Sequence, residues 1–221
     1  MKYLNEREIQ KNIKNQNIII KVEEDSIAEE MGIEPGDILI SINDSEVKDV
    51  LDYRYFIQDE YIEVVIKKPN GEEWELEIEK DEFEDLGIVF ESGLMDKAKS
   101  CSNKCIFCFI DQNPKGMRKT IYFKDDDSRL SFLQGNYITL TNMKDEDLDR
   151  IIFYHLSPIN ISVHATDIEV RKFMLKNPNS VKIMEQIEKL ANANIKMNFQ
   201  IVLCKDINDK HILDKSIEDL S

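Results

Sequence analysis

The sequence predicts an α/β protein of two domains, a small β-rich domain followed by a domain in which strands and helices alternate. Two observations predict this class. Before about residue 95 the apolar residues recur mostly with a period of two, and after it apolar strands are separated by amphipathic helices. The chain has 221 residues, of which 42% are hydrophobic, so it can fill one or two cores. It has no internal repeat and no low-complexity tract.

The first domain begins with a strand and a short helix. The apolar run at 17–22 predicts the strand, and the segment DSIAEEMG predicts a helix that Asp25 or Ser26 caps and a glycine ends. In the turn EPGD, Pro35 presets φ and Gly36 permits a positive φ. The domain then continues with a strand at 37–43, a helix at 49–57, and two alternating strands at 61–68 and 73–80 that the turn at 69–71 joins.

The second domain alternates strands with amphipathic helices, which is typical of βαβ units around a parallel sheet. Ligand sites in such sheets lie at the carboxyl ends of the strands. Those ends carry Thr141 and Asn142, then His164, then Cys204. The predicted strands lie at 136–141, 159–165 and 196–204, and the predicted helices at 144–156, 167–177, 180–194 and 208–220.

These patterns set the expected domain limits. We expect residues 1–80 to fold as an independent domain, 81–94 to be a linker or the first strand of the next domain, and 95–221 to form that next domain.

Charge and composition exclude several classes of partner. The chain has 29 basic and 44 acidic side chains and a formal net charge of -15, which should repel nucleic acid. Around the cysteines the balance reverses, with six basic and two acidic residues from Asp96 to Lys119. The N-terminus lacks the apolar run of a signal peptide, and no stretch is long enough to span a bilayer. We therefore expect a cytoplasmic protein that does not bind membranes.

Three of the four cysteines lie in the nine residues CSNKCIFCF, at Cys101, Cys105 and Cys108. In a reducing compartment a disulfide framework is unexpected, so the cluster indicates metal or redox chemistry. Spacing at i, i+4 and i+7 also fits one buried helix face, but the flanking residues favour a loop. Zinc needs a fourth ligand, Cys204 or His164, and a redox pair leaves one thiol unexplained. A 4Fe-4S cluster uses all three thiolates and leaves one iron open.

The segment CSNKCIFCF resembles the C-x3-C-x-aromatic-C motif of radical S-adenosylmethionine (SAM) enzymes. The wider run from NKCIFCFIDQ through SVHATD to QIVLCKDIND is similar to one subfamily, in which a PDZ-like module precedes a radical SAM domain and a C-terminal domain of unknown function. The resemblance implies that Cys101, Cys105 and Cys108 hold a 4Fe-4S cluster and that SAM chelates the fourth iron. It further implies reductive cleavage of SAM to a 5'-deoxyadenosyl radical, with an unknown substrate and an electron donor such as flavodoxin or ferredoxin.

The resemblance also suggests residues that contact SAM. Phe107 would pack near the adenine, and the usual Gly-Gly-Glu stretch is replaced by Thr141, Asn142 and Met143. The Asn142 carbonyl can accept from the SAM amine, but the residue equally fits a helix N-cap. Ser162 and His164 are expected on one face of the sheet, as are Asn198 and Gln200 on the later strand, and all four would line the SAM cavity if that face is the barrel interior. For His164 a purely structural role is the alternative. The segment DDD at 125–127 is expected to be a solvated turn, with cation binding as the alternative, and Cys204 a buried thiol at a strand end.

The order of elements over residues 10–80 resembles a bacterial PDZ-like module, because Gly32, Gly36 and Asp37 fall in the family's order. The resemblance implies peptide capture by strand addition to a sheet edge, and a structural or docking role is the alternative. The family's Gly-containing carboxylate-binding loop has one candidate, DLGIVF at 85–90, which equally fits a strand of the next domain.

The radical SAM resemblance implies a partial (βα) barrel that is incomplete here. About four barrel strands are counted, and the chain ends within a predicted helix. We therefore expect an N-terminal fragment of a longer protein. The alternative function is a non-catalytic PDZ-type adaptor whose second domain is stabilised by zinc or an iron-sulfur cluster.

Overall fold

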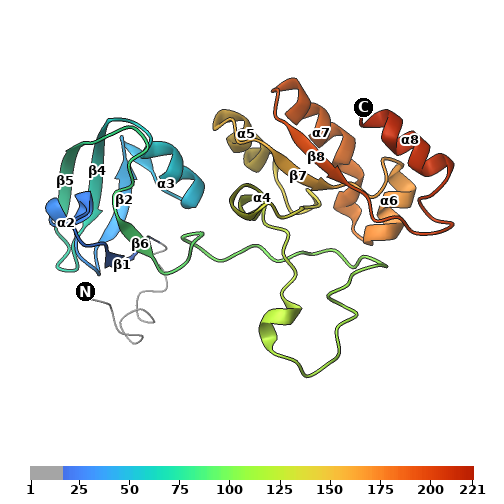
Figure 1. Cartoon of the computed structure of the whole chain (residues 1–221), viewed down its shortest axis with the longest axis horizontal. Helices are drawn as coiled ribbons and strands as arrows, with labels where there is room; N and C mark the ends of the chain where they lie inside the picture. Colours follow the sequence, from blue (N-terminus) through green and yellow to red (C-terminus); the bar gives the residue numbers. More distant parts are fainter. Residues whose placement is uncertain (1–16) are drawn as a thin grey trace. The chain divides into compact units, whose positions relative to one another are not determined.

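The computed structural model describes residues 17–221, and the chain divides into two compact units after Lys97 (Figure 1). Residues 1–16, which belong to the predicted first domain, lie outside the described part. Each unit is described by itself.

The first unit is built on antiparallel strands. Strand β1 (Ile19–Val22) pairs with β6 (Ile88–Phe90), and a single bridge from Ile18 to Ile38 connects this pair to a four-stranded sheet. The order in that sheet is β3 (Ser45–Glu46), β2 (Ile38–Ile42), β4 (Tyr61–Lys67) and β5 (Glu73–Glu79).

Two short helices in this unit begin at side-chain caps. Helix α2 (Ile27–Glu30) starts after Ser26, whose hydroxyl accepts from the Glu29 N–H at 3.3 Å. Helix α3 (Val50–Phe56) starts after Asp49, whose carboxylate accepts from the Leu51 N–H at 3.0 Å. Caps of this kind satisfy amide groups that have no partner within a helix, so the predicted helix starts are confirmed.

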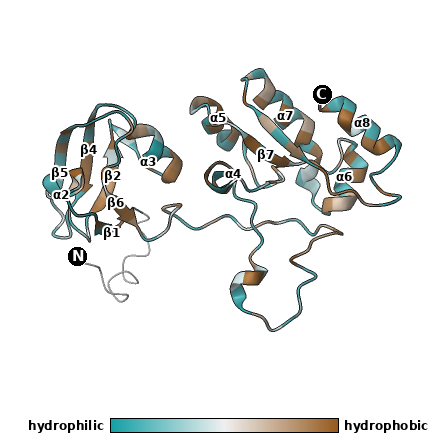
Figure 2. Cartoon of the chain, in the orientation of Figure 1, coloured by the Kyte–Doolittle hydropathy of each residue, from teal (hydrophilic) through white to brown (hydrophobic). Residues whose placement is uncertain are grey.

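The core of the first unit follows the alternation of its strands. Ile62, Val64 and Ile66 of β4 are fully buried, while the intervening residues are exposed or half-buried. Figure 2 shows the resulting hydrophobic bands along β2, β4 and β6. Burial of one face of each strand therefore sets the register of the sheet.

Segment 81–94 is not a strand of the second unit. It supplies β6, which runs antiparallel to β1, and Leu86 within it is completely buried. Hydrogen bonds to β1 hold this segment in the first unit of the structure, and the predicted domain limits stay predictions.

The second unit contains a small parallel sheet. Strand β7 (Ile159–Ser162) pairs in parallel with β8 (Met197–Gln200), and all four residues of β7 are buried. The predicted strand at 136–141 is reduced to one parallel bridge, between Ile138 and Ile161. Leu140 has a φ of 62°, which ends the extended conformation, and the neighbouring backbone pairs with a side chain instead.

Helices surround this sheet in the order that the sequence predicts. Helix α4 (Ser128–Gln134) and the 3-10 turn η1 (Lys119–Tyr122) were not expected from the sequence, and the predicted helix at 180–194 divides into η2 and α7. The remaining helices are α5 (Asp145–Phe153), α6 (Ile168–Leu175), η2 (Pro178–Lys182), α7 (Ile183–Asn192) and α8 (His211–Asp219). Among residues 17–221, no helix combines the length and apolar character needed to cross a membrane.

Candidate functional site at the cysteine loop

Residues 99–108, here called the cysteine loop, are fixed by backbone hydrogen bonds. The Cys101 N–H donates to the Lys124 carbonyl at 2.8 Å. The N–H groups of Lys104 and Ile106 donate, at 3.0 and 2.9 Å, to the carbonyls of the last two residues of α6. Carbonyls at the end of a helix lack partners within it, so the cysteine loop caps α6. The loop and the helix therefore hold each other in place.

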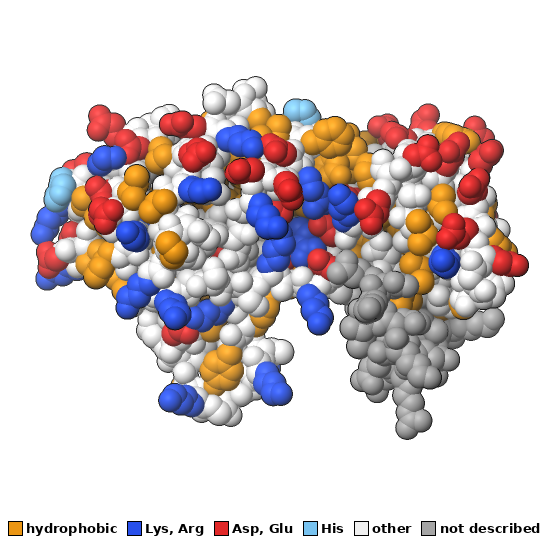
Figure 3. Space-filling model, turned by 180° about the vertical axis from the view of Figure 1, so that it is seen from behind, with side chains coloured by type: hydrophobic (Ala, Val, Ile, Leu, Met, Phe, Trp, Pro, Cys, Tyr) orange, Lys and Arg blue, Asp and Glu red, His pale blue; other side chains and the backbone are white. Residues whose placement is uncertain are grey.

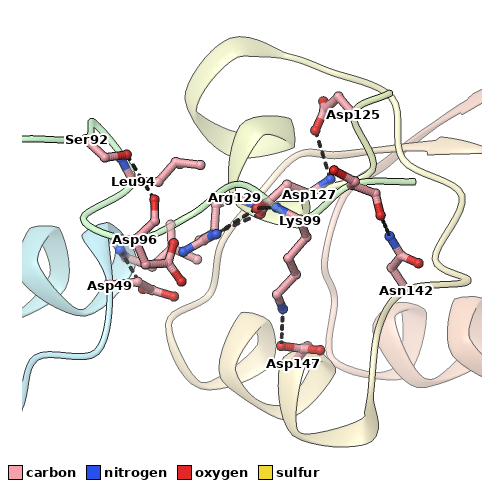
Figure 4. Close-up of polar contacts among 12 residues, drawn as sticks. Asp49, Ser92, Leu94, Asp96, Lys99, Asp125, Asp127, Arg129, Asn142 and Asp147 are labelled. Carbon is pink, nitrogen blue, oxygen red and sulfur yellow. Dashed lines mark hydrogen bonds and ion pairs between the residues drawn. The ribbon is translucent and has the colours of Figure 1, made fainter. Parts of the chain in front are cut away.

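Side chains fix the start of the cysteine loop (Figure 4). The Lys99 N–H donates to the Asp127 carboxylate at 2.7 Å, and the Lys99 ammonium donates to Asp147 at 3.1 Å. The Asn142 amide donates to the Ser100 carbonyl at 2.9 Å. Charged partners strengthen such hydrogen bonds, so the approach to Cys101 is rigidly defined.

The three thiols of the loop are half-buried, reduced and close enough to interact electrostatically. Burial, together with the neighbouring Cys101 and Cys108, raises the pKa of Cys105 to about 12. Burial, with the charge of Asp126, also raises the pKa of Cys101. Within the described residues, no group of three or more His, Cys, Asp and Glu side chains is arranged to hold a single metal ion. Three adjacent thiols nevertheless have the donor chemistry of an iron-sulfur cluster, whose ligands are spread over several irons.

Basic charge lies beside the thiols. The Lys124 ammonium contacts the Asp111 carboxylate at 2.6 Å, and its charge interacts with Cys108 and Cys101. The hydrogen bond from Lys124 and, to a smaller extent, the neighbouring Cys108 lower the pKa of Asp111. This arrangement offsets part of the negative charge that thiolates bring to the loop.

Phe107 and His164 connect the cysteine loop with the end of β7. Their ring centroids are 4.6 Å apart at an interplanar angle of 65°. His164 Nδ1 accepts from the Val202 N–H at 3.2 Å, and the side chain is 4% exposed. Burial, with the nearby charge of Arg171, lowers the pKa of His164 to about 3, so this histidine is neutral at physiological pH.

These observations can be compared with known families. A family model described as the Radical SAM-like domain matches residues 80–221, well over half of the chain. The chain belongs to the radical SAM family. A PDZ domain model matches residues 18–68, so the predicted α/β class and both predicted domain families are confirmed. A search of curated proteins found no match. The C-terminal domain of unknown function stays a prediction.

In the radical SAM-like unit, Thr141 and Asn142 lie against the cysteine loop. The Thr141 hydroxyl donates to Asn103 Oδ1 at 3.0 Å, and Asn142 Oδ1 accepts from the Ser102 hydroxyl at 2.8 Å. The helix that follows begins after Lys144, so the N-cap interpretation of Asn142 is wrong. Thr141 also lines an open pocket of about 270 Å³. A contact of either residue with SAM stays a prediction.

The remaining predicted residues lie in the parallel sheet of the radical SAM-like unit. Ser162 is buried and its hydroxyl lies 3.4 Å from Gln200 Oε1, because these residues are paired in the register of β7 and β8. The Asn198 amide donates to Asn160 Oδ1 at 2.8 Å. Asn198 and Gln200 share one face of β8, beside Ser162, whereas His164 has a φ of 64° and leaves the strand conformation. A contact of these residues with SAM stays a prediction.

Two expectations about acidic and thiol side chains are wrong. The segment 125–127 is no solvated turn, because Asp126 and Asp127 are 2% and 0% exposed. The Asp126 carboxylate accepts from the Thr139 N–H at 2.6 Å, and burial raises its pKa. Burial also acts to raise the pKa of Asp127, but hydrogen bonds from Arg129 and the Lys99 N–H lower it overall. Cys204 is half-buried in a turn beyond β8, not at a strand end.

Sequence reasoning missed the buried polar residues that support the loop, above all Arg171. This side chain is 0% exposed and donates to the carbonyls of Thr139 at 2.7 Å, Ser162 at 3.0 Å and Ser180 at 3.0 Å, and also to that of Val163. Arg171 thereby joins α6 to β7, to η2 and to residues 136–141, here called the bridge segment because Ile138 forms a single bridge to β7. Its only sequence signal is a cation among the buried positions of an amphipathic helix.

In the PDZ unit, the candidate carboxylate-binding loop is already paired within the chain. The Gly87 N–H donates to the Asp85 carboxylate at 2.8 Å, and the Gly87 carbonyl accepts from the Glu23 N–H at 2.9 Å. Phe90 of β6 packs against Tyr53 of α3 with ring centroids 5.4 Å apart. An internal carboxylate thus takes the amide that a peptide terminus would use. Peptide capture by this unit stays a prediction.

Proposed function

We propose that the radical SAM-like unit holds a 4Fe-4S cluster through Cys101, Cys105 and Cys108 and binds SAM at the iron without a protein ligand. The observation that carries the proposal is three interacting thiols on one loop, which hydrogen bonds tie to α6 and to the sheet. When bound, the cluster supplies an electron for cleavage of SAM to a 5'-deoxyadenosyl radical. The protein would then be an enzyme that abstracts hydrogen from a substrate of unknown identity.

The chain's own residues would position the cofactors and exclude water. The cysteine loop presents its thiols from a fixed backbone, so little order has to be gained on cofactor binding. The half-buried Phe107, held from behind by the buried and neutral His164, offers a ring on which an adenine can pack. Thr141, Asn142 and the paired Ser162 and Gln200 provide hydrogen-bonding groups for the rest of SAM.

We also propose that an acidic electron carrier, such as flavodoxin or ferredoxin, donates at the projecting segment 109–124. Its Lys115, Arg118 and Lys119 are exposed, and Figure 3 shows basic side chains at the tip of this lobe. The exposed Phe109 and Met117 add apolar contacts. Reduction by such a carrier should slow as ionic strength rises, because salt screens charge pairing. A rate independent of salt would contradict this docking.

Anaerobic reconstitution with iron and sulfide tests the proposed function. The wild-type chain should retain close to four irons, and replacement of Cys101, Cys105 or Cys108 by Ala should remove most of this iron, because each thiolate ligates one iron. The matched control is Cys204→Ala, which should reconstitute like the wild type. Loss of iron in Cys204→Ala but not in Cys101→Ala would disprove the assignment.

A second candidate is a non-catalytic adaptor, and the PDZ match over 18–68 favours it. Its second unit would be stabilised by zinc or by a cluster that does not act on SAM. A colourless protein with stoichiometric zinc would favour the adaptor, and so would a cluster whose spectrum is the same with and without SAM.

A further inference from the structure

Asn177 links the end of α6 to the cysteine loop. Lys176, with a φ of 50°, ends the helix, and the next residue, Asn177, is 6% exposed. The Asn177 amide donates to Asn103 Oδ1 at 2.7 Å and to the Ser102 hydroxyl at 3.1 Å. Its own Oδ1 accepts from the Asn179 N–H at 2.9 Å and caps η2. One side chain therefore makes two contacts with the loop and one with a helix start.

Asn103, which receives this contact, is itself 3% exposed and lies between Cys101 and Cys105. Its amide donates to the Thr139 hydroxyl at 2.8 Å, and that hydroxyl lies 2.7 Å from the buried Asp126 carboxylate. A continuous set of hydrogen bonds thus runs from the end of α6, through the loop, to the segment beside β7. Buried networks in which every member has a partner fix one conformation.

We propose that Asn177 is a positioning residue that holds the cysteine loop in order before any cofactor binds, through an amide clamp formed with Ser102 and Asn103. The inference rests on the proposed function, because the loop it orders carries the three cluster ligands. The clamp lies directly before the Lys104 and Ile106 amides that cap α6. Without the clamp, the segment between Cys101 and Cys105 has no side-chain contact with the end of the helix. Its backbone would then lose conformational entropy when the cluster assembles, which makes assembly less favourable.

Two substitutions separate the clamp from the helix cap. Asn177→Asp keeps the oxygen that caps η2 but loses both donors to the loop. Asn177→Ser also keeps a capping oxygen, is too short to reach the loop, and adds no charge. The matched control is Asn179→Ala, since Asn179 is exposed and its amide makes one 3.4 Å contact with the Thr141 carbonyl.

Amide hydrogen exchange of the cofactor-free chain measures directly whether the clamp orders the cysteine loop. The Lys104 and Ile106 amides should exchange about tenfold faster in Asn177→Asp and Asn177→Ser, because losing one or two hydrogen bonds shifts the local opening equilibrium by roughly that factor. Amides of β4 in the first unit and all amides of Asn179→Ala should be unchanged. Wild-type exchange at Lys104 and Ile106 in both Asn177 variants would overturn the proposal.

Reconstitution gives the second measurement. Both Asn177 variants should take up iron more slowly than Asn179→Ala, and the electron paramagnetic resonance lines of the reduced cluster should broaden, since the ligands are less well fixed. Identical uptake and spectra in all chains would contradict the clamp. If the wild type itself assembles no cluster, the proposed function fails, while the exchange experiment still decides the role of Asn177.

Discussion

At the scale of the residue, the three cysteines could be predicted and their supports could not. Cys101, Cys105 and Cys108 lie within nine consecutive residues, so one short stretch of sequence is enough to recognise the motif. Asn103 and Asn177 are separated by 74 positions and meet only because α6 folds back onto the loop. Asparagine is common in turns, so neither residue is distinctive until the fold brings both together.

The buried His164 predicts a pH-dependent stability of the second unit. Its folded pKa of about 3 lies below the ordinary value of 6.5. As the pH falls below 6.5, His164 becomes protonated in the unfolded state but stays neutral in the folded state. The free energy of unfolding therefore decreases as the pH falls from 6.5 toward 3. We expect a loss of about 1 kcal/mol between pH 7 and pH 5.5 in urea denaturation of the cofactor-free chain. His164→Asn, which tolerates positive φ, should lose less, and an equal loss in both chains would contradict the assignment.

Gly87 is expected to tolerate no side chain. Its φ is 79°, and a Cβ atom there would lie 2.3 Å from the Cβ of Ser26, the N-cap of α2. Gly87→Ala should destabilise the first unit by about 2 to 4 kcal/mol, measured from Trp74 fluorescence during urea denaturation. The matched control is Gly93→Ala, because nothing lies within 4 Å of the added carbon. Equal stability of the two variants would show that the close approach to Ser26 is not real.

At the scale of the element, most helices and the strands of the first unit follow from local pattern, whereas the bridge segment does not. The strand predicted at 136–141 contains alternating apolar residues, but the positive φ of 62° at Leu140 ends its pairing with β7 after Ile138. The following backbone turns toward the cysteine loop, where Asn142 pairs with Ser100 across 42 positions, so periodicity alone could not detect this end. The pairing of segment 81–94 with β1 is also a contact distant in sequence, so local pattern left this segment open between a linker and a strand.

Arg171 should be the side chain on which the packing of these elements depends most. Its removal leaves buried carbonyls on the bridge segment, β7 and η2 without donors. We expect Arg171→Met to lower the free energy of unfolding by about 3 kcal/mol or more in chemical denaturation followed by circular dichroism. The exposed neighbour provides the control, and Lys172→Met should change stability by less than about 0.5 kcal/mol. Similar values for the two variants would contradict the proposed role.

At the scale of the whole molecule, charge separates the two units. Residues 1–97 contain 27 acidic and 11 basic side chains, and residues 98–221 contain 17 and 18. The first unit therefore has a formal charge of -16 and the second of +1, which together give the net charge of -15. The sequence predicted two families and their order correctly, since each has a contiguous motif. The unit boundary after Lys97 depends on the pairing of β1 with β6 and was not visible locally.

Truncation tests that boundary. Residues 1–97 should unfold cooperatively, because they include β6 and the buried Leu86. Residues 1–80 should be much less stable, since β1 then loses its antiparallel partner and the core loses apolar contacts. Thermal unfolding of the two segments is the measurement. Equal midpoints would show that β6 is dispensable, and that the first domain ends near residue 80 as the sequence pattern suggested.

The central claim concerns a cluster with one iron left open for SAM, and electron paramagnetic resonance tests it most directly. The anaerobically reconstituted chain is reduced with dithionite, and its spectrum is recorded with and without SAM. The account predicts the signal of a reduced 4Fe-4S cluster whose g-values shift when SAM is added, and loss of this signal in Cys105→Ala. A cluster signal that SAM leaves unchanged, or a wild-type chain that binds no iron, would contradict it.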